Sequence, residues 1–118
     1  MTGSRSHWRR GLAVAWTVAV FAMLWAPPPP TPRVEIPHFD KYVHFSLFAI
    51  FGALWRWAGL PWRRVLLLAV PIAIATELGQ GLVPWPRTPD VLDVVADLAG
   101  VGLALGAMLR NGRDSNPR

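Results

Sequence analysis

Four long apolar runs, separated by turns rich in proline and arginine, constrain the fold of this chain more than any other feature. A membrane-crossing helix needs roughly 20 apolar residues, and each run has that length or comes close to it. We expect helices at about 10–26, 41–57, 64–83 and 91–110. Only 16% of the residues are charged, whereas an average soluble domain has about 25%. We therefore predict one all-α domain over residues 1–118, an integral, multi-pass bundle of four transmembrane helices in the cell membrane.

The first apolar run has two interpretations. A basic start followed by an apolar stretch is also the pattern of a cleaved signal peptide. The residues before the break, Met23 to Ala26, lack the small-x-small pattern of a cleavage site, and Pro27 follows them directly. We favour an uncleaved first helix. A proline-rich outer loop then occupies 27–39, where six prolines exclude helix.

Basic residues are distributed unequally around the apolar runs. Nine of the 12 Lys and Arg residues belong to the N-terminal segment, the turn between the second and third runs, and the C-terminal tail. The other three are Arg33, Lys41 and Arg87. Cytoplasmic loops carry the excess of Lys and Arg, so we predict that both termini are cytoplasmic. Because the basic groups flank the runs and form no stripe with interleaved aromatics, we expect no nucleic-acid partner.

Eight polar residues gather at the outer end of the last three predicted helices. Residues three or four apart share one face of a helix, so they form small sets, each about one turn below the outer surface. Charges inside a bilayer cost a few kcal/mol each and usually mark a site. We therefore interpret the set as a candidate ligand site, and we expect His44, Glu77 and Asp93 to lie within direct or one-water reach. The eight residues are Asp40, Lys41, His44, Glu77, Gln80, Arg87, Asp93 and Asp97.

These residues also have structural interpretations. Asp40 could cap a helix, Arg87 could pair with a nearby aspartate, and Gln80 could satisfy a backbone carbonyl. However, five carboxylates, Asp90 included, face only two cations, Lys41 and Arg87. The uncompensated carboxylates must face water, take up protons or bind a cation.

Two of these carboxylates are expected to influence each other. Asp93 and Asp97 lie four residues apart, so they share one helix face. Two like charges partly out of water do not both ionise freely. We expect one of them to hold a proton, or a cation to lie between them, with Asp97→Asn tolerated and Asp93→Asn damaging.

Three short motifs carry a resemblance to a known family. They are D-K-x-x-H-F at Asp40 to Phe45, E-x-x-Q at Glu77 to Gln80, and R-x5-D-x6-G at Arg87 to Gly100. In this order the chain resembles the VanZ-like family of small bacterial membrane proteins, over about 40–106. The resemblance implies a multi-helix protein of the bacterial cell envelope. The family takes its name from a member linked to low-level resistance to the glycopeptide teicoplanin. It usually has Asn where this chain has Asp97.

Three functions are compatible with this pattern. The first, which we favour, is an envelope protein that binds a polar ligand at its outer face, a lipid-linked glycan or a glycopeptide, with Lys41 and Arg87 on anionic groups. The second is an intramembrane enzyme, in which His44 and Glu77 act as acid and base or His44 and the carboxylates ligate a divalent cation. The third is a structural or partner-binding subunit. No nucleophile stands out, because the chain has no cysteine and Ser46 and Thr76 have no obvious partner in the sequence, so we assign no catalytic residue. We also assign no metal and no cofactor, and we expect membrane lipid as a partner.

Overall fold

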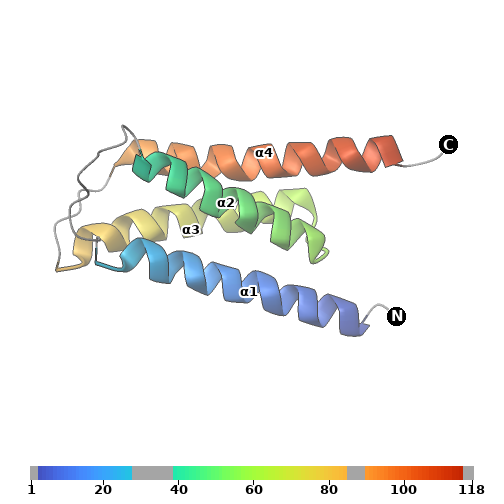
Figure 1. The fold of residues 1–118 in the computed structure, drawn as a ribbon, viewed down its shortest axis with the longest axis horizontal. Coiled ribbons are helices and arrows are strands. Elements are labelled where there is room, and N and C mark those ends of the chain that lie inside the picture. Colours follow the sequence, from blue (N-terminus) through green and yellow to red (C-terminus); the bar gives the residue numbers. More distant parts are fainter. Residues whose placement is uncertain (1–2, 28–38, 85–89, 116–118) are drawn as a thin grey trace.

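The computed structural model describes residues 3–27, 39–84 and 90–115. Within these ranges the chain forms four helices and no strand, which confirms the predicted all-α fold. Consecutive helices run in opposite directions along one elongated bundle (Figure 1). The helices are α1 (Gly3–Trp25), α2 (Phe39–Trp57), α3 (Trp62–Leu82) and α4 (Val91–Ser115).

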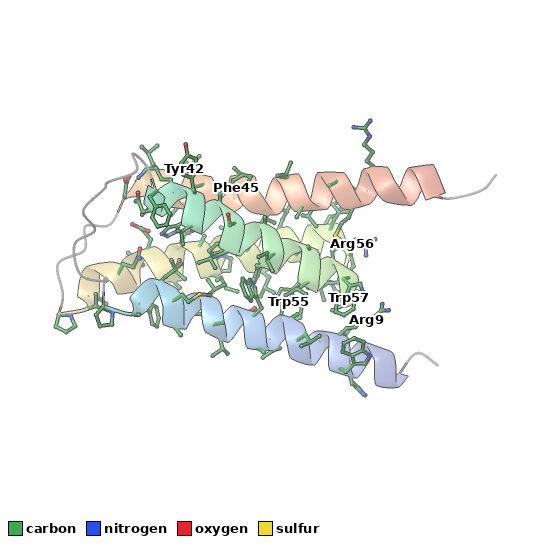
Figure 2. All side chains as sticks on the ribbon, in the orientation of Figure 1. Arg9, Tyr42, Phe45, Trp55, Arg56 and Trp57 are labelled. Atoms are coloured by element: carbon green, nitrogen blue, oxygen red, sulfur yellow. The ribbon has the colours of Figure 1, made fainter. Side chains whose placement is uncertain are left out.

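The bundle has two chemically different ends. The start of α1, the turn between α2 and α3, and the end of α4 lie together at one end (Figure 1), which we call the basic end. There the guanidinium of Arg9 lies 4.7 Å from the ring centroid of Trp57, and Arg56 is close by (Figure 2). The opposite end, where α2 and α4 start and α3 finishes, is the acidic end. The two ends correspond to the inner and outer sides that the sequence predicts.

Two helices are longer than predicted. α1 begins at Gly3 rather than near residue 10, and α4 continues to Ser115 rather than ending near 110. Neither extension contains a proline, and proline is the residue that most strongly stops a helix. The predicted bounds followed the ends of the apolar runs. The helices continue beyond those ends into polar residues.

Among the described residues, two helices are long and apolar enough to cross a membrane. They are Trp62–Leu82 and Val91–Arg110, each with a mean hydropathy of 1.8. α1 and α2 do not reach the same combination of length and hydropathy. α2 carries Asp40, Lys41 and Arg56 within its bounds, and these lower its mean hydropathy. The four-span topology therefore stays a prediction.

A close approach between α2 and α4 positions the acidic end. α2 packs against α4 more extensively than any other pair of helices packs. A side chain at Gly100 would collide with the backbone carbonyl of Phe45 and the amide of Ala49. Small residues let membrane helices come together in this way. The contact lies within one turn of His44 on α2 and Asp97 on α4, so it sets the distance across which these two side chains meet.

The end of α1 is attached to α3 by hydrogen bonds to main-chain carbonyls. The indole N–H of Trp25 donates to the Thr76 carbonyl at 3.0 Å, and the side-chain amide of Gln80 donates to the Leu24 carbonyl at 2.9 Å. Gly79 leaves room for the Trp25 ring, which a Cβ at that position would overlap. These contacts fix α1 beside the last turns of α3.

Candidate functional site

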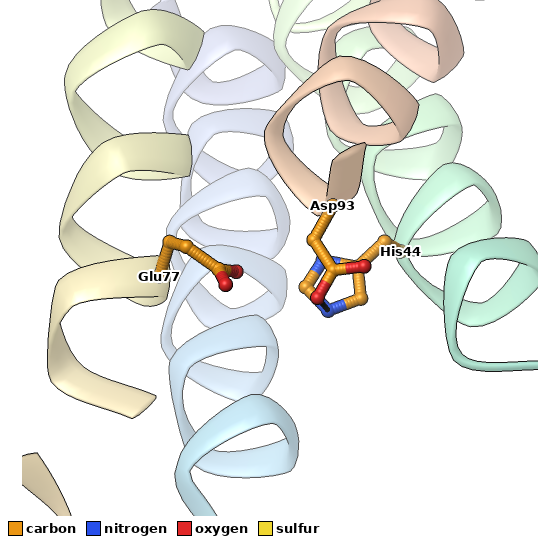
Figure 3. A group of neighbouring side chains, drawn as sticks. All are labelled: His44, Glu77 and Asp93. Carbon is orange, nitrogen blue, oxygen red and sulfur yellow. Dashed lines mark ion pairs between the residues drawn. The ribbon is translucent and has the colours of Figure 1, made fainter. Parts of the chain in front are cut away.

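Three helices each bring one ionisable side chain to the same point inside the acidic end. His44 comes from α2, Glu77 from α3 and Asp93 from α4 (Figure 3). One ligand-capable atom of each lies within 4.8 Å of the others. The residues are 2%, 6% and 5% exposed, so they are shielded from solvent by the bundle itself. The convergence that the sequence predicts for these three residues is present in the structure, while their role as a ligand site stays a prediction.

His44 lies between two aspartates of α4. Its Nδ1 is 2.7 Å from Oδ1 of Asp97, and its Nε2 is 3.6 Å from Oδ2 of Asp93. The first distance is a short hydrogen bond, and the second is too long for one. Asp97 is fully buried, and its Oδ2 has no hydrogen-bond partner among the described residues. Asp93 and Asp97 thus share a helix face, as predicted, and the imidazole lies against both.

Lys41 joins three carboxylates nearer the surface. Its ammonium lies 3.3 Å from Asp40, 2.9 Å from Asp90 and 3.3 Å from Oδ1 of Asp93. Asp90 also accepts the Leu92 N–H at 2.9 Å, which makes it the N-cap of α4. The Lys41 ammonium, followed by the Leu92 N–H, holds the pKa of Asp90 below its usual range. These contacts form the outer layer of the cluster, in which the side chains of Asp40 and Asp90 are exposed.

Glu77 connects the outer layer around Lys41 and Asp90 to the buried His44 and Asp93. Its Oε2 accepts a short hydrogen bond from the backbone N–H of Asp90. Its Oε1 is buried and has no hydrogen-bond partner among the described residues. An acceptor that is buried without a partner costs free energy, so this oxygen indicates a place where a cation or a hydrogen-bond donor would be stabilised.

The predicted residues separate into three groups. Asp40, Lys41, His44, Glu77, Asp93 and Asp97 form one connected cluster. Gln80 is buried beside it, but its amide donates to α1, which is the structural role that the sequence left open for it. Arg87 lies outside the described residues.

One residue that the sequence did not assign to the site belongs to the cluster. Asp90 contacts Lys41 through its carboxylate and Glu77 through its backbone N–H. Its sequence signal was an aspartate immediately before an apolar run, which is typical of an N-cap. That capping role is real, and the tertiary fold adds the two contacts.

The cluster carries excess negative charge. Its described residues include five carboxylates, and Lys41 supplies the one permanent positive charge among them. Even with His44 protonated, three negative charges remain if every carboxylate is ionised. Removing such charges from water is costly unless they are paired.

An open groove adjoins the cluster on the outside of α3 and α4. Its volume is about 230 Å³. Leu78 and Val91 on its rim are 62% and 78% exposed, so its walls face the surroundings of the bundle. Glu77 and Asp90 are the two ionisable residues among those that line it. The lining residues are Ile74, Glu77, Leu78, Asp90, Val91 and Val94.

Buried ionisable groups between helices, two of which are apolar enough to cross a bilayer, indicate a helical membrane protein. Residues 4–110 match the protein family described as VanZ/LLP1. This match covers most of the chain, so the protein belongs to the VanZ/LLP1 family, as the motifs predict. No curated protein and no solved structure gives a significant match.

Proposed function

We propose that this protein binds the head group of an envelope lipid at an outward-facing site in the cell membrane. The observation that carries the proposal is the junction between the buried polar cluster and the open groove beside it. Glu77 and Asp90 belong to both. A lipid has the same two parts, a polar head group and an apolar chain. This junction favours a lipid-linked ligand over a free glycopeptide.

The proposal includes four membrane-spanning helices with both termini in the cytoplasm. Two helices meet the length and hydropathy of a span, and the alternating direction of the four would bring the cluster to the side opposite the termini (Figure 1). Nine of the 12 basic residues lie near the two termini, at the end of α2 or at the start of α3, and the positive-inside rule makes that side cytoplasmic.

The apolar walls of the groove support a lipid chain as its occupant. Ile74, Leu78 and Val91 are exposed apolar side chains on its edge, and in a bilayer such side chains contact acyl or isoprenoid chains. The head group would then meet Glu77, whose Oε1 is an unused acceptor, and Lys41, whose ammonium can contact an anionic group.

Blocking the groove tests this function. Leu78→Trp would fill the groove, whereas Leu67→Trp places the same residue at a comparably exposed position of α3 outside it. Each variant is purified in mild detergent, and the lipids that remain bound are identified by mass spectrometry. We expect one lipid class to be retained by the wild type and by Leu67→Trp but lost from Leu78→Trp. Equal retention by all three proteins would contradict the proposal.

The same residues favour one second candidate, an enzyme that hydrolyses an envelope lipid. The observation that favours an enzyme is the convergence of His44, Glu77 and Asp93. Such a set can transfer protons or hold a metal ion. Product release from the lipid class retained by the wild type, absent in Glu77→Gln, would establish it. Binding without turnover leaves the first function.

A further inference from the structure

We propose that His44, Glu77 and Asp93 form a binding site for a divalent transition-metal cation such as Zn²⁺ or Mn²⁺, which presents an open coordination position to a phosphate group. The metal site rests on the geometry of the three side chains. Its use in holding a lipid phosphate rests on the proposed function.

The first observation is that each of the three side chains is held by one polar atom and offers another. His44 is fixed through Nδ1 by Asp97, Asp93 through Oδ1 by Lys41, and Glu77 through Oε2 by the Asp90 N–H. The remaining atoms are Nε2 of His44, Oδ2 of Asp93 and Oε1 of Glu77. A preorganised metal site has this arrangement, in which outer contacts orient each ligand and leave its donor atom available.

The tautomer of His44 depends on the protonation of Asp97. When Asp97 is ionised, as a cation in the site would favour, its carboxylate can only accept a hydrogen bond, so the hydrogen of the 2.7 Å contact belongs to Nδ1. Nε2 then carries a lone pair and faces Oδ2 of Asp93 at 3.6 Å. Two lone pairs this close repel each other unless a proton or a metal cation lies between them. In many metal sites a histidine donates its other N–H to a carboxylate in just this way.

A second, independent observation is the unpartnered oxygen of Glu77. The residue is 94% buried, and its Oε1 lacks a partner among the described residues. In Figure 3 the Glu77 side chain extends from α3 toward His44 and Asp93. A proton shared between His44 and Asp93 would leave this oxygen unsatisfied, whereas a metal ion can bind all three side chains.

The spacing is close to that of a coordination shell. Donor atoms bound tetrahedrally at about 2.1 Å from a metal lie about 3.4 Å from one another. The His44–Asp93 pair is already at 3.6 Å, and one ligand atom of each of the three residues lies within 4.8 Å of the others. Closing the shell would require the Glu77 carboxylate to move toward the other two donors.

The chemistry of the donors selects the kind of cation. Imidazole suits Zn²⁺ and other transition metals, and carboxylates suit Mn²⁺ as well. Three protein ligands leave at least one position for water or a phosphate oxygen. With His44 neutral, as a metal ligand must be, four negative charges remain in the cluster if every carboxylate is ionised, and the cation would offset two of them. The cation would also give an anionic head group a positive centre to bind.

Metal titration of the full chain tests the site. The protein is expressed without a histidine tag and with His7 and His38 replaced by Gln, stripped with chelator in detergent, and titrated with Zn²⁺ alone in a calorimeter. We expect one Zn²⁺ per chain. Glu77→Gln and His44→Gln should weaken binding at least about tenfold because each removes a ligand. Asp114→Asn removes a carboxylate from the last turn of α4, at the opposite end of the bundle, and should bind as the wild type does.

Asp97 provides a second comparison, because it acts as a positioning residue. Asp97→Leu removes the acceptor for His44 Nδ1 and should weaken Zn²⁺ binding about 10- to 100-fold. Asp97→Asn keeps an oxygen acceptor and should restore most of the affinity. Gel filtration and circular dichroism check that each variant is folded. A further measurement uses the protein with all three proposed ligands intact. Co²⁺ is added in place of Zn²⁺, and its absorption spectrum should show the bands of a tetrahedral or five-coordinate ion.

Lipid measurements with and without chelator separate the two proposals. Stoichiometric Zn²⁺ binding without lipid retention would support the metal site and contradict the lipid function. Lipid retention that persists in chelator, with no stoichiometric Zn²⁺ binding, would support the lipid function and overturn the metal site. Equal Zn²⁺ affinity in Glu77→Gln and Asp114→Asn would also overturn the metal site. If both hold, chelator should release phosphate-bearing lipid from the wild type.

Discussion

Oδ1 of Asp97 lies 2.7 Å from Nδ1 of His44, inside the bundle and away from solvent. This contact joins α2 to α4 one turn below the surface, and it fixes which imidazole nitrogen faces Asp93. The family pattern usually has Asn at the position of Asp97, and an amide oxygen could accept the same hydrogen bond. The acid at this position therefore keeps the geometry of the contact and adds an ionisable group.

This contact makes the two aspartates of α4 unequal. Asp97→Asn should change the free energy of unfolding by less than about 1 kcal/mol, because the acceptor for His44 remains. Asp97→Leu should cost about 1–3 kcal/mol because it leaves a buried N–H unpaired. Asp93→Asn should be damaging, since it weakens a contact to Lys41. Arg87, which the sequence offers as a partner for a nearby aspartate, lies outside the described residues. The measurement is thermal unfolding in detergent, and equal losses from Asp93→Asn and Asp97→Asn would contradict the argument.

The lack of a side chain at Gly100 is predicted to permit the close approach of α2 and α4. Gly100→Ala introduces a methyl group against the Phe45 carbonyl, and we expect it to cost about 1–3 kcal/mol. Gly102→Ala is the matched control on the same helix, because a Cβ there meets nothing within 4 Å. It should be neutral or stabilise the helix by up to about 1 kcal/mol. Thermal melts of the two variants compare them directly, and a control that lost as much stability would exclude the steric explanation.

Gln80 is predicted to serve the fold and not the ligand. Gln80→Leu leaves the Leu24 carbonyl without its donor and should lower the free energy of unfolding by about 1–3 kcal/mol. The same variant should bind Zn²⁺ as the wild type does, since none of the three proposed ligands is changed. If Gln80→Leu lost as much Zn²⁺ affinity as Glu77→Gln, Gln80 would have to be counted among the residues of the metal site.

The orientation in the membrane is predicted from charge and can be measured with reporter fusions. A reporter fused after Arg64 follows the first turn of α3, at the basic end. It should report a cytoplasmic location. A fusion after Pro86 should report the outer side. The reverse pattern would invert the topology and turn the acidic cluster toward the cytoplasm.

The sequence by itself determined the all-α fold, the approximate helix positions and the place of the polar residues near the helix ends. A long apolar run without strand alternation satisfies its backbone hydrogen bonds most simply as a helix, and in lipid it must do so within itself. Position along a helix then fixes how far His44, Glu77 and Asp93 lie from its end. The motifs also determined the family, which residues 4–110 match. All these properties depend on order along the chain, so they could be derived without knowing how the helices rotate.

Only the tertiary structure decided which polar groups meet. α3 is apolar around most of its circumference, so no pattern showed that Gln80 contacts α1 while Glu77 faces α4. The joining of Asp90 to Lys41 and Glu77, and the place of His44 between two aspartates, depend on helix rotation and on the close approach at Gly100. Rotation is set by side-chain packing between helices, which a single sequence does not display.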